Sequence, residues 1–332
     1  MKYSSLFFFG MLFFSFCTPH VNSDSEKDSI LQDSMVQHEI EAAKPLVEIK
    51  IRKELLYDSY TLEDEYPYQD TVRSFQWDKI HDALFFIDSV QLEPTTWAVL
   101  QNYKNRNREA PLVKEFTRNE YKRVTDAFGV ERYQSVPLFL TTDTITGERY
   151  GRDGTPVKLL GETGGFYHVK TLNFDGDWLV PKRYVKVLGD TVAYNHVVVV
   201  DRKNQNITTL EKVGKEWLVR SMNPATTGVH SPPYAKPTPL GLFVIQEQKP
   251  KMIYLKDGST ETGGFAPWAS RFSNGGYIHG VPVNAPGTSL VEYSATLGTI
   301  PRSHMCVRNV TSHAKFIYDW APVEASFVYV LE

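Results

Sequence analysis

The stretch His196-Val-Val-Val-Val-Asp201 decides the fold of the second half of the chain. Four consecutive valines favour a β-strand, because β-branched side chains suit a pleated sheet better than a helix. A polar turn follows at Lys203-Asn-Gln-Asn206, and two more strand-like runs come next, Ile207-Thr-Thr-Leu210 and Trp217-Leu-Val-Arg-Ser221. Short strands separated by Gly, Asn and Pro predict a β-sandwich or barrel rather than a parallel α/β fold.

One helix is predicted near the end of this region. Phe316, Ile317 and Trp320 fall on one face of the segment from Thr311 to Trp320, which Thr311 or Ser312 is expected to cap. A last strand, Ser326-Phe-Val-Tyr-Val-Leu331, is expected to return to the sheet. The predicted fold class is mainly β, α+β overall, with a β-sandwich or barrel domain at 191–332.

Residues 131–190 are predicted to form a smaller barrel. Strand-like runs alternate there with turn signals such as Asp153-Gly154 and Gly164-Gly165. The runs Gly165-Phe-Tyr-His-Val, Gly176-Asp-Trp-Leu-Val and Arg183-Tyr-Val resemble a bacterial SH3-like domain. In such domains exposed aromatic rings often hold wall peptide. Tyr167 or Trp178 is open to that role, although core packing is the expected role of Trp178.

The region 46–130 has a mixed pattern. Trp77, Ile80, Leu84 and Ile87 lie near helical spacing, and a second helix is predicted from Glu93 to about Arg106. No motif in this region indicates a chemical role. It is interpreted as a packing or spacer module, with a partner-binding surface as the alternative.

The first 17 residues are predicted to be an export signal. Lys2 precedes a short apolar run, Leu6 to Phe16, which is too short to span a bilayer as a helix. The run ends at Cys17 and resembles a bacterial lipoprotein signal, in which the cysteine is lipidated and anchors the protein to a membrane. Cleavage without lipidation and a retained anchor are the alternatives. Residues 18–45 are polar and are predicted to be a tether.

The composition argues against nucleic-acid binding, because the formal net charge of the 332 residues is only -3. The chain has two cysteines, so removal of Cys17 or its lipidation would leave Cys306 as a free thiol. Cys306 lies in Pro301-Arg-Ser-His-Met-Cys-Val-Arg-Asn309, and another histidine precedes it in Tyr277-Ile-His-Gly280. A thiol with nearby histidines is a candidate nucleophile with its base.

Four motifs in chain order resemble the YkuD-type L,D-transpeptidase catalytic domain. They are Arg220-Ser-Met-Asn-Pro-Ala-Thr-Thr-Gly228 with Lys236-Pro-Thr-Pro-Leu-Gly-Leu-Phe-Val-Ile245, then Tyr277-Ile-His-Gly280, then Ser303-His-Met-Cys-Val-Arg308, and finally Ala314-Lys-Phe-Ile-Tyr-Asp-Trp320. The resemblance covers about 140 residues. It implies a peptidoglycan enzyme of the cell envelope or periplasm that needs no cofactor and no metal.

The resemblance also implies roles for individual residues. Cys306 would attack the bond between the third residue of a stem peptide and D-alanine, with His279 as general base and the Gly280 carbonyl orienting its ring. The N–H groups of Met305 and Cys306 would hold the oxyanion, and a second stem amine would resolve the thioester. The supporting and substrate-binding candidates are His304, Ser303, Arg308, Trp268 and Tyr277. Trp268 and Tyr277 are equally open to core roles, and His313 is expected to be structural.

Two features depart from the family pattern. Met305 stands where the family normally has glycine, which would strain the backbone if this position needs a positive φ. The segment 280–302 is longer than usual, which predicts an inserted loop from about Ala285 to Gly298. Both changes bring substrate preference into question and leave two alternatives open: hydrolysis of a stem or lipoprotein linkage, and an inactive wall-binding lipoprotein. A zinc site formed by His279, His304 and Cys306 is a further alternative.

Overall fold

The computed structural model describes residues 47–332, so the predicted signal, Cys17 and the polar tether lie outside the described residues. The described part is mainly β, as predicted, and holds two α-helices, α2 (Trp77–Val90) and α3 (Thr311–Trp320). No helix in this part is long and apolar enough to cross a membrane.

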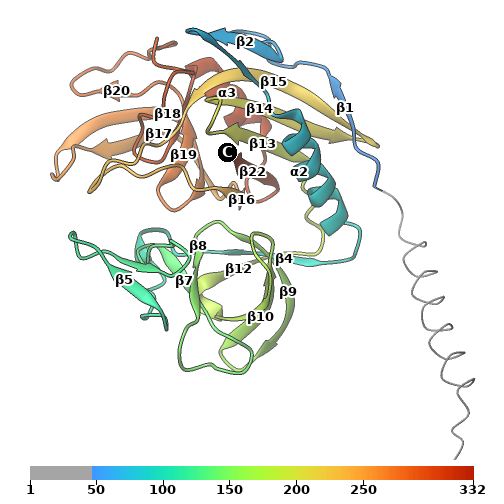
Figure 1. Ribbon diagram of the computed structural model, residues 1–332, viewed down its shortest axis with the longest axis vertical. Coiled ribbons are helices and arrows are strands. Elements are labelled where there is room, and N and C mark those ends of the chain that lie inside the picture. Colours follow the sequence, from blue (N-terminus) through green and yellow to red (C-terminus); the bar gives the residue numbers. More distant parts are fainter. Residues whose placement is uncertain (1–46) are drawn as a thin grey trace, which may run out of the picture. The chain divides into compact units, whose positions relative to one another are not determined.

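An 11-stranded curled sheet forms most of the region after residue 195 (Figure 1). Its main path runs β16-β22-β13-β14-β15-β21-β19-β18-β17, with β1 added beside β15 and β20 beside β18. The strands are β1 (Lys50–Lys53), β13 (His196–Asp201), β14 (Asn206–Val213), β15 (Glu216–Thr226), β16 (Gly241–Val244), β17 (Glu247–Leu255), β18 (Thr262–Ser273), β19 (Gly276–His279), β20 (Val283–Asn284), β21 (Val307–Asn309) and β22 (Ser326–Leu331).

The valine run in β13 is buried on both faces of this sheet. Val197 and Val199 belong to a core cluster with Leu84 of α2, whereas Val198 and Val200 belong to a second cluster with Ile317 of α3. Figure 1 shows β13 between α2 and the C-terminal elements. A strand covered on both sides needs apolar residues at every position, which explains four consecutive valines where a half-exposed strand would alternate.

A second, five-stranded sheet has the order β11-β10-β9-β4-β12. Three two-stranded ladders complete the fold. These strands are β2 (Glu65–Tyr68), β3 (Thr71–Ser74), β4 (Thr96–Leu100), β5 (Phe116–Arg118), β6 (Val124–Asp126), β7 (Ser135–Leu138), β8 (Arg149–Arg152), β9 (Pro156–Thr163), β10 (Phe166–Thr171), β11 (Asp177–Pro181) and β12 (Val185–Gly189), with 3-10 turns η1 (Tyr103–Asn105) and η2 (Lys182–Tyr184). Trp178 packs in the core of this sheet, as expected.

The helix predicted from Glu93 to Arg106 is wrong. Thr96–Leu100 forms strand β4, which pairs with β9 on one side and with β12 on the other. Ala98, Val99 and Leu100 are completely buried there. The local helix-start signal at Glu93-Pro94 is weak compared with tertiary context. Long-range pairing of Thr96–Leu100 with β9 and β12 therefore outweighs it. Strand β4, from the 46–130 region, therefore lies in the same sheet as strands from the 131–190 region.

The predicted bounds of the last helix and the last strand are confirmed, but the predicted cap is wrong. The N-cap position of α3 is Val310, which makes no side-chain cap. The Thr311 hydroxyl instead accepts a hydrogen bond from the Val281 N–H and donates one to the Val291 carbonyl. The hydroxyl therefore ties the segment after His279 to the helix.

Helix α2 should contribute to stability mainly through its buried face. Leu84 is 0% exposed in the cluster with β13, whereas its neighbour Phe85 is 45% exposed. We expect Leu84→Ala to lower the free energy of unfolding by about 2–5 kcal/mol, because it leaves a cavity in a closed core. Phe85→Ala is the matched control and should change it by less than about 0.5 kcal/mol. Equal losses in urea denaturation would contradict this packing.

Candidate active site

The register of two parallel strands places Cys306 and His279 on one face of the curled sheet. β19 pairs with β21 so that Ile278 lies beside Val307 and His279 beside Arg308. Cys306 immediately precedes β21 and thus lies beside Tyr277, two positions from His279. Side chains two positions apart along a strand share a face, and such diagonal neighbours are within reach of a long or ring side chain.

Both side chains line one cavity of about 820 Å³, together with Ser303, His304 and Arg308. The sequence predicted all five as site residues. The β17–β18 hairpin supplies much of the remaining wall, including Tyr254 and Asp257. Sequence reasoning missed these wall residues, because no motif marks them.

His279 is arranged to act as a base. Its ring is 3% exposed, and Nδ1 lies 2.6 Å from the Gly280 carbonyl oxygen. That carbonyl can only accept, so Nδ1 carries the proton and Nε2 keeps its lone pair. Burial lowers the pKa of His279 to about 4, against the opposing effect of the Gly280 hydrogen bond and with a further lowering by the Arg308 charge. The imidazole is therefore neutral at neutral pH.

Cys306 is the free thiol of the described residues. Its Sγ donates to the Gly275 carbonyl oxygen at 3.5 Å. Burial raises the pKa of the thiol, while the Tyr277 backbone N–H and the Arg308 charge oppose that rise. The resting pair is thus a neutral thiol and a neutral imidazole, so the proton has to leave sulfur as the sulfur attacks.

Met305 has a φ of +123°, the region that favours glycine. The sequence predicts backbone strain at Met305 if its φ is positive, and the φ is positive. Neighbouring contacts hold the conformation: the Thr238 hydroxyl donates to the Met305 carbonyl at 2.8 Å and accepts from the Gly228 N–H at 2.9 Å. Within residues 47–332, no acceptor takes the backbone N–H of Met305 or of Cys306, which leaves both donors available.

Ser303 and Arg308 have different environments beside the thiol. Ser303 is 1% exposed, and its hydroxyl donates to the Cys306 carbonyl, so it braces the loop. Arg308 lines the cavity, and its buried Nε has no hydrogen-bond partner among the described residues. An unpaired guanidinium N–H is suited to a carboxylate.

His304 lines the same cavity, but among the described residues no hydrogen bond joins it to Cys306 or to His279. It is exposed, and its Nε2 lies 2.9 Å from the Asp257 carboxylate. In a regular extended segment, His304 and Cys306 would lie on the same side of the chain. The positive φ of Met305 between them interrupts this alternation. The described residues contain no group of three His, Cys, Asp or Glu side chains that could hold a metal ion, so the zinc alternative has no support in this part of the chain.

The two aromatic candidates do not line the cavity. Tyr277 is 2% exposed, and its hydroxyl donates to the Tyr103 hydroxyl at 3.1 Å. Trp268 packs edge-on against Tyr318 of α3 with a centroid separation of 5.5 Å. His313 is completely buried and contacts the Ser221 hydroxyl through Nε2 at 2.8 Å, a structural setting.

The long segment after β20 lies beside the site, as predicted for an inserted loop. Ser294 lines the cavity, and Leu297 packs with Val281 and Val310 in a small cluster. The Gly298 N–H donates to the Ala225 carbonyl at 3.2 Å, and the Thr311 N–H donates to the Glu292 carbonyl at 2.9 Å. The segment is therefore fixed to the sheet and to α3 at several points.

The pH dependence of Cys306 alkylation should show that Cys306 and His279 are both neutral before the reaction. Because the pKa of the thiol is raised and that of His279 is lowered, little thiolate is present at neutral pH. We expect the rate with iodoacetamide, followed by mass spectrometry, to keep rising above pH 8 without a plateau near pH 7. A plateau below pH 7 would reveal a preformed thiolate–imidazolium pair and contradict this description. Glutathione under the same conditions is the reference.

Replacing Met305 by glycine should stabilise the protein. Glycine adopts a φ of +123° without a Cβ penalty, so Met305→Gly should raise the free energy of unfolding by about 1 kcal/mol. Asn274→Gly is the control: its φ of +46° is one that asparagine already tolerates, and little change is expected. A clear loss of stability in Met305→Gly, measured by urea denaturation, would mean that the methionine side chain outweighs the strain.

A family model matches the C-terminal region of the chain. Residues 195–330 match the YkuD family model, the L,D-transpeptidase catalytic domain. Similar solved structures include an L,D-transpeptidase from Mycobacterium smegmatis, 18% identical over 52% of this chain and 79% of that chain, with a TM-score of 0.34. Another is an L,D-transpeptidase from Mycobacterium tuberculosis H37Rv, 19% identical over 55% of this chain and 92% of that chain, with a TM-score of 0.33.

A fused zinc-dependent amidase/peptidase/peptidoglycan-binding domain-containing protein from Clostridium acetobutylicum is also similar. It is 17% identical over 41% of this chain, which spans 52% of that protein, with a TM-score of 0.30. No curated protein matches the chain. Cys306 and His279 both fall inside the region 195–330 that matches the L,D-transpeptidase catalytic domain.

Proposed function

We propose that the protein is a cysteine-dependent L,D-transpeptidase of the cell envelope that acts on peptidoglycan stem peptides. The observation that carries the proposal is the shared cavity of Cys306 and His279, in which the imidazole is neutral and its Nδ1 is fixed by the Gly280 carbonyl. The match of residues 195–330 to the family model supports the same reaction class.

The first half-reaction forms a thioester. His279 Nε2 takes the thiol proton while Sγ of Cys306 attacks the carbonyl that joins the third stem residue to D-alanine. The backbone N–H groups of Met305 and Cys306 stabilise the oxyanion, a contribution of about 3–4 kcal/mol per donor in related chemistry. The imidazolium then gives its proton to the departing D-alanine amine. Arg308, with its unpaired Nε, binds a carboxylate of the donor stem.

The second half-reaction transfers the acyl group to an amine of another stem, and the base accepts the amine proton. A second cavity of about 470 Å³ beside the segment that carries the thiol would offer room for an acceptor amine. It is lined by Gly275 and Met305, the residues next to the thiol on this side, and by charged residues from the β5–β6 region such as Lys122 and Glu131. Water in place of the amine would give hydrolysis, which remains the second candidate activity.

The accessory features complete the proposal. Lipidation of Cys17 would place the enzyme at a membrane of the envelope, with residues 18–45 as its tether. The five-stranded sheet would be an SH3-like module that assists binding to the wall. The partners would then be stem peptides and, through the anchor, a membrane.

The test is incubation of the protein with a stem tetrapeptide followed by intact-mass spectrometry. We expect an acyl adduct on Cys306 and dimeric stems as product. Cys306→Ala should abolish both, and His279→Ala should slow acylation by about 10²–10⁴-fold, because the general base is lost.

His304→Ala is the matched control, since it removes another cavity histidine that contacts Asp257 instead of the thiol. It should keep most of the activity. A folded wild-type protein that never forms the adduct would rule out the proposed reaction. An adduct that yields only monomeric, shortened stems would favour hydrolysis.

A further inference from the structure

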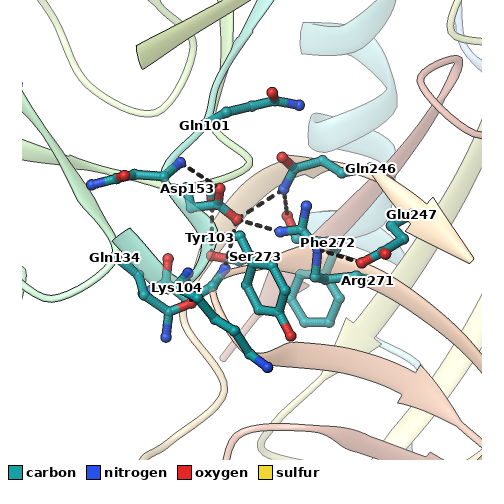
Figure 2. A network of polar contacts seen from close by, with 12 residues as sticks. Gln101, Tyr103, Lys104, Gln134, Asp153, Gln246, Glu247, Arg271, Phe272 and Ser273 are labelled. Atoms are coloured by element: carbon teal, nitrogen blue, oxygen red, sulfur yellow. Dashed lines mark hydrogen bonds and ion pairs between the residues drawn. The ribbon is translucent and has the colours of Figure 1, made fainter. Parts of the chain in front are cut away.

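A completely buried carboxylate, Asp153, connects the smaller sheet region to the strands of the candidate active site. It follows β8, in the part of the chain that precedes the matched domain, and is 0% exposed. Figure 2 shows its side chain directed at Arg271 of β18 and at Gln246, which lies between β16 and β17. The Arg271 Nη1 lies 2.5 Å from Asp153 Oδ2, and the Gln246 Nε2 lies 3.1 Å from the same oxygen.

Every side-chain contact of this carboxylate is with a donor. Besides Arg271 and Gln246, the backbone N–H of Asn102 donates to Oδ1 at 2.8 Å and that of Asn274 donates to Oδ2 at 3.0 Å. Burial raises the pKa of Asp153, and the Arg271 charge and the other donors oppose that rise. Four donors, one of them the charged Arg271 guanidinium, favour the ionised carboxylate over the protonated acid.

These contacts hold the turn between β18 and β19. The Ser273 hydroxyl donates to the Asp153 carbonyl at 2.9 Å, and the Asn274 N–H donates to the Asp153 carboxylate. The next residue in the turn is Gly275, whose carbonyl accepts the hydrogen bond from the Cys306 thiol. The contact of the buried carboxylate and the contact of the thiol thus fall on adjacent residues, Asn274 and Gly275.

Close backbone approach and ring contacts support the same junction. A Cβ added at Gly154, which has a φ of +89°, would lie 1.8 Å from the Phe272 carbonyl oxygen. The Arg271 guanidinium lies 4.4 Å above the ring of Tyr103, and its Nε contacts Glu247 at 3.3 Å. The Tyr103 hydroxyl meets that of Tyr277, the residue beside Cys306 in the sheet register.

We infer that Asp153 is a positioning residue: through the turn 273–276 it fixes the Gly275 carbonyl, and with it the position of the Cys306 thiol that donates to this carbonyl. The inference rests on the proposed function for its kinetic readout, but the thiol geometry is independent of it. The upstream region thereby acts on the chemistry of the matched domain, in addition to any role in binding the wall.

The test compares Asp153→Asn with the wild type in the full-length protein. The variant keeps the size of the side chain, but its amide nitrogen would face donors and leave Arg271 with a weaker partner. We expect kcat for stem-peptide acylation to fall by about tenfold or more, because small misplacements of a reacting group have effects of this size, while KM changes less than about twofold. The iodoacetamide rate of Cys306 should rise severalfold as the turn loosens.

Asp88→Asn is the matched control. Asp88 is another buried carboxylate, 7% exposed, which pairs with Lys212 at 2.6 Å and accepts from the Trp217 indole, but it lies in α2 and contacts nothing near the thiol. It should lower stability while leaving kcat and the alkylation rate of Cys306 unchanged. Ser273→Ala, a milder change at the same turn, should shift both readouts in the direction of Asp153→Asn and serves if that variant does not fold.

The outcomes separate this inference from the proposed function. Wild-type kinetics and alkylation in Asp153→Asn, or in Ser273→Ala where Asp153→Asn does not fold, would overturn the inference, as would equal effects in Asp88→Asn. If the wild type shows no acylation at all, the proposed function fails, and the alkylation rates still decide whether Asp153 positions the thiol.

Discussion

The candidate site depends on the parallel pairing of β19 with β21. This pairing lets two residues 27 positions apart in the chain share one face, and a shift of one residue would turn either side chain to the opposite face. Several contacts protect the register. Thr311 ties the chain after His279 to α3, and Thr238 holds the Met305 carbonyl just before Cys306. The loop that carries the thiol is therefore fixed from both ends.

The electrostatics of the pair follow from the same enclosure. The buried imidazole and the half-buried thiol both favour their neutral forms, because a low-dielectric environment penalises charge. Arg308 adds a positive charge on the same face, which disfavours the imidazolium and favours the thiolate. Neither effect produces a strongly ionised nucleophile at rest. A substrate carboxylate near Arg308 would offset its charge and ease protonation of His279 as the reaction begins.

Much of this arrangement was predictable from sequence, and the reason differs between elements. The thiol, its candidate base and the positive φ expected to strain Met305 follow from local motifs, because each motif places its residues a few positions apart. The strands of the smaller sheet follow from turn residues such as Gly164 and Gly165. Strand β4 and the Thr311 contacts were not predictable, because their partners lie tens of residues away. Asp153 and Arg271 are 118 positions apart, and neither stands in a motif, so their pairing becomes visible only in three dimensions.

Strand β4 makes the smaller sheet depend on a segment that lies well before its other strands in the sequence. Residues 96–100 lie between β9 and β12, so the sheet is interleaved with the chain that precedes it. A gene fragment beginning at residue 131 would encode β9 and β12 without β4, the strand that lies between them. A fragment meant to carry the complete sheet must therefore include residues 96–100, and a boundary drawn by sequence resemblance alone would leave out this inner strand.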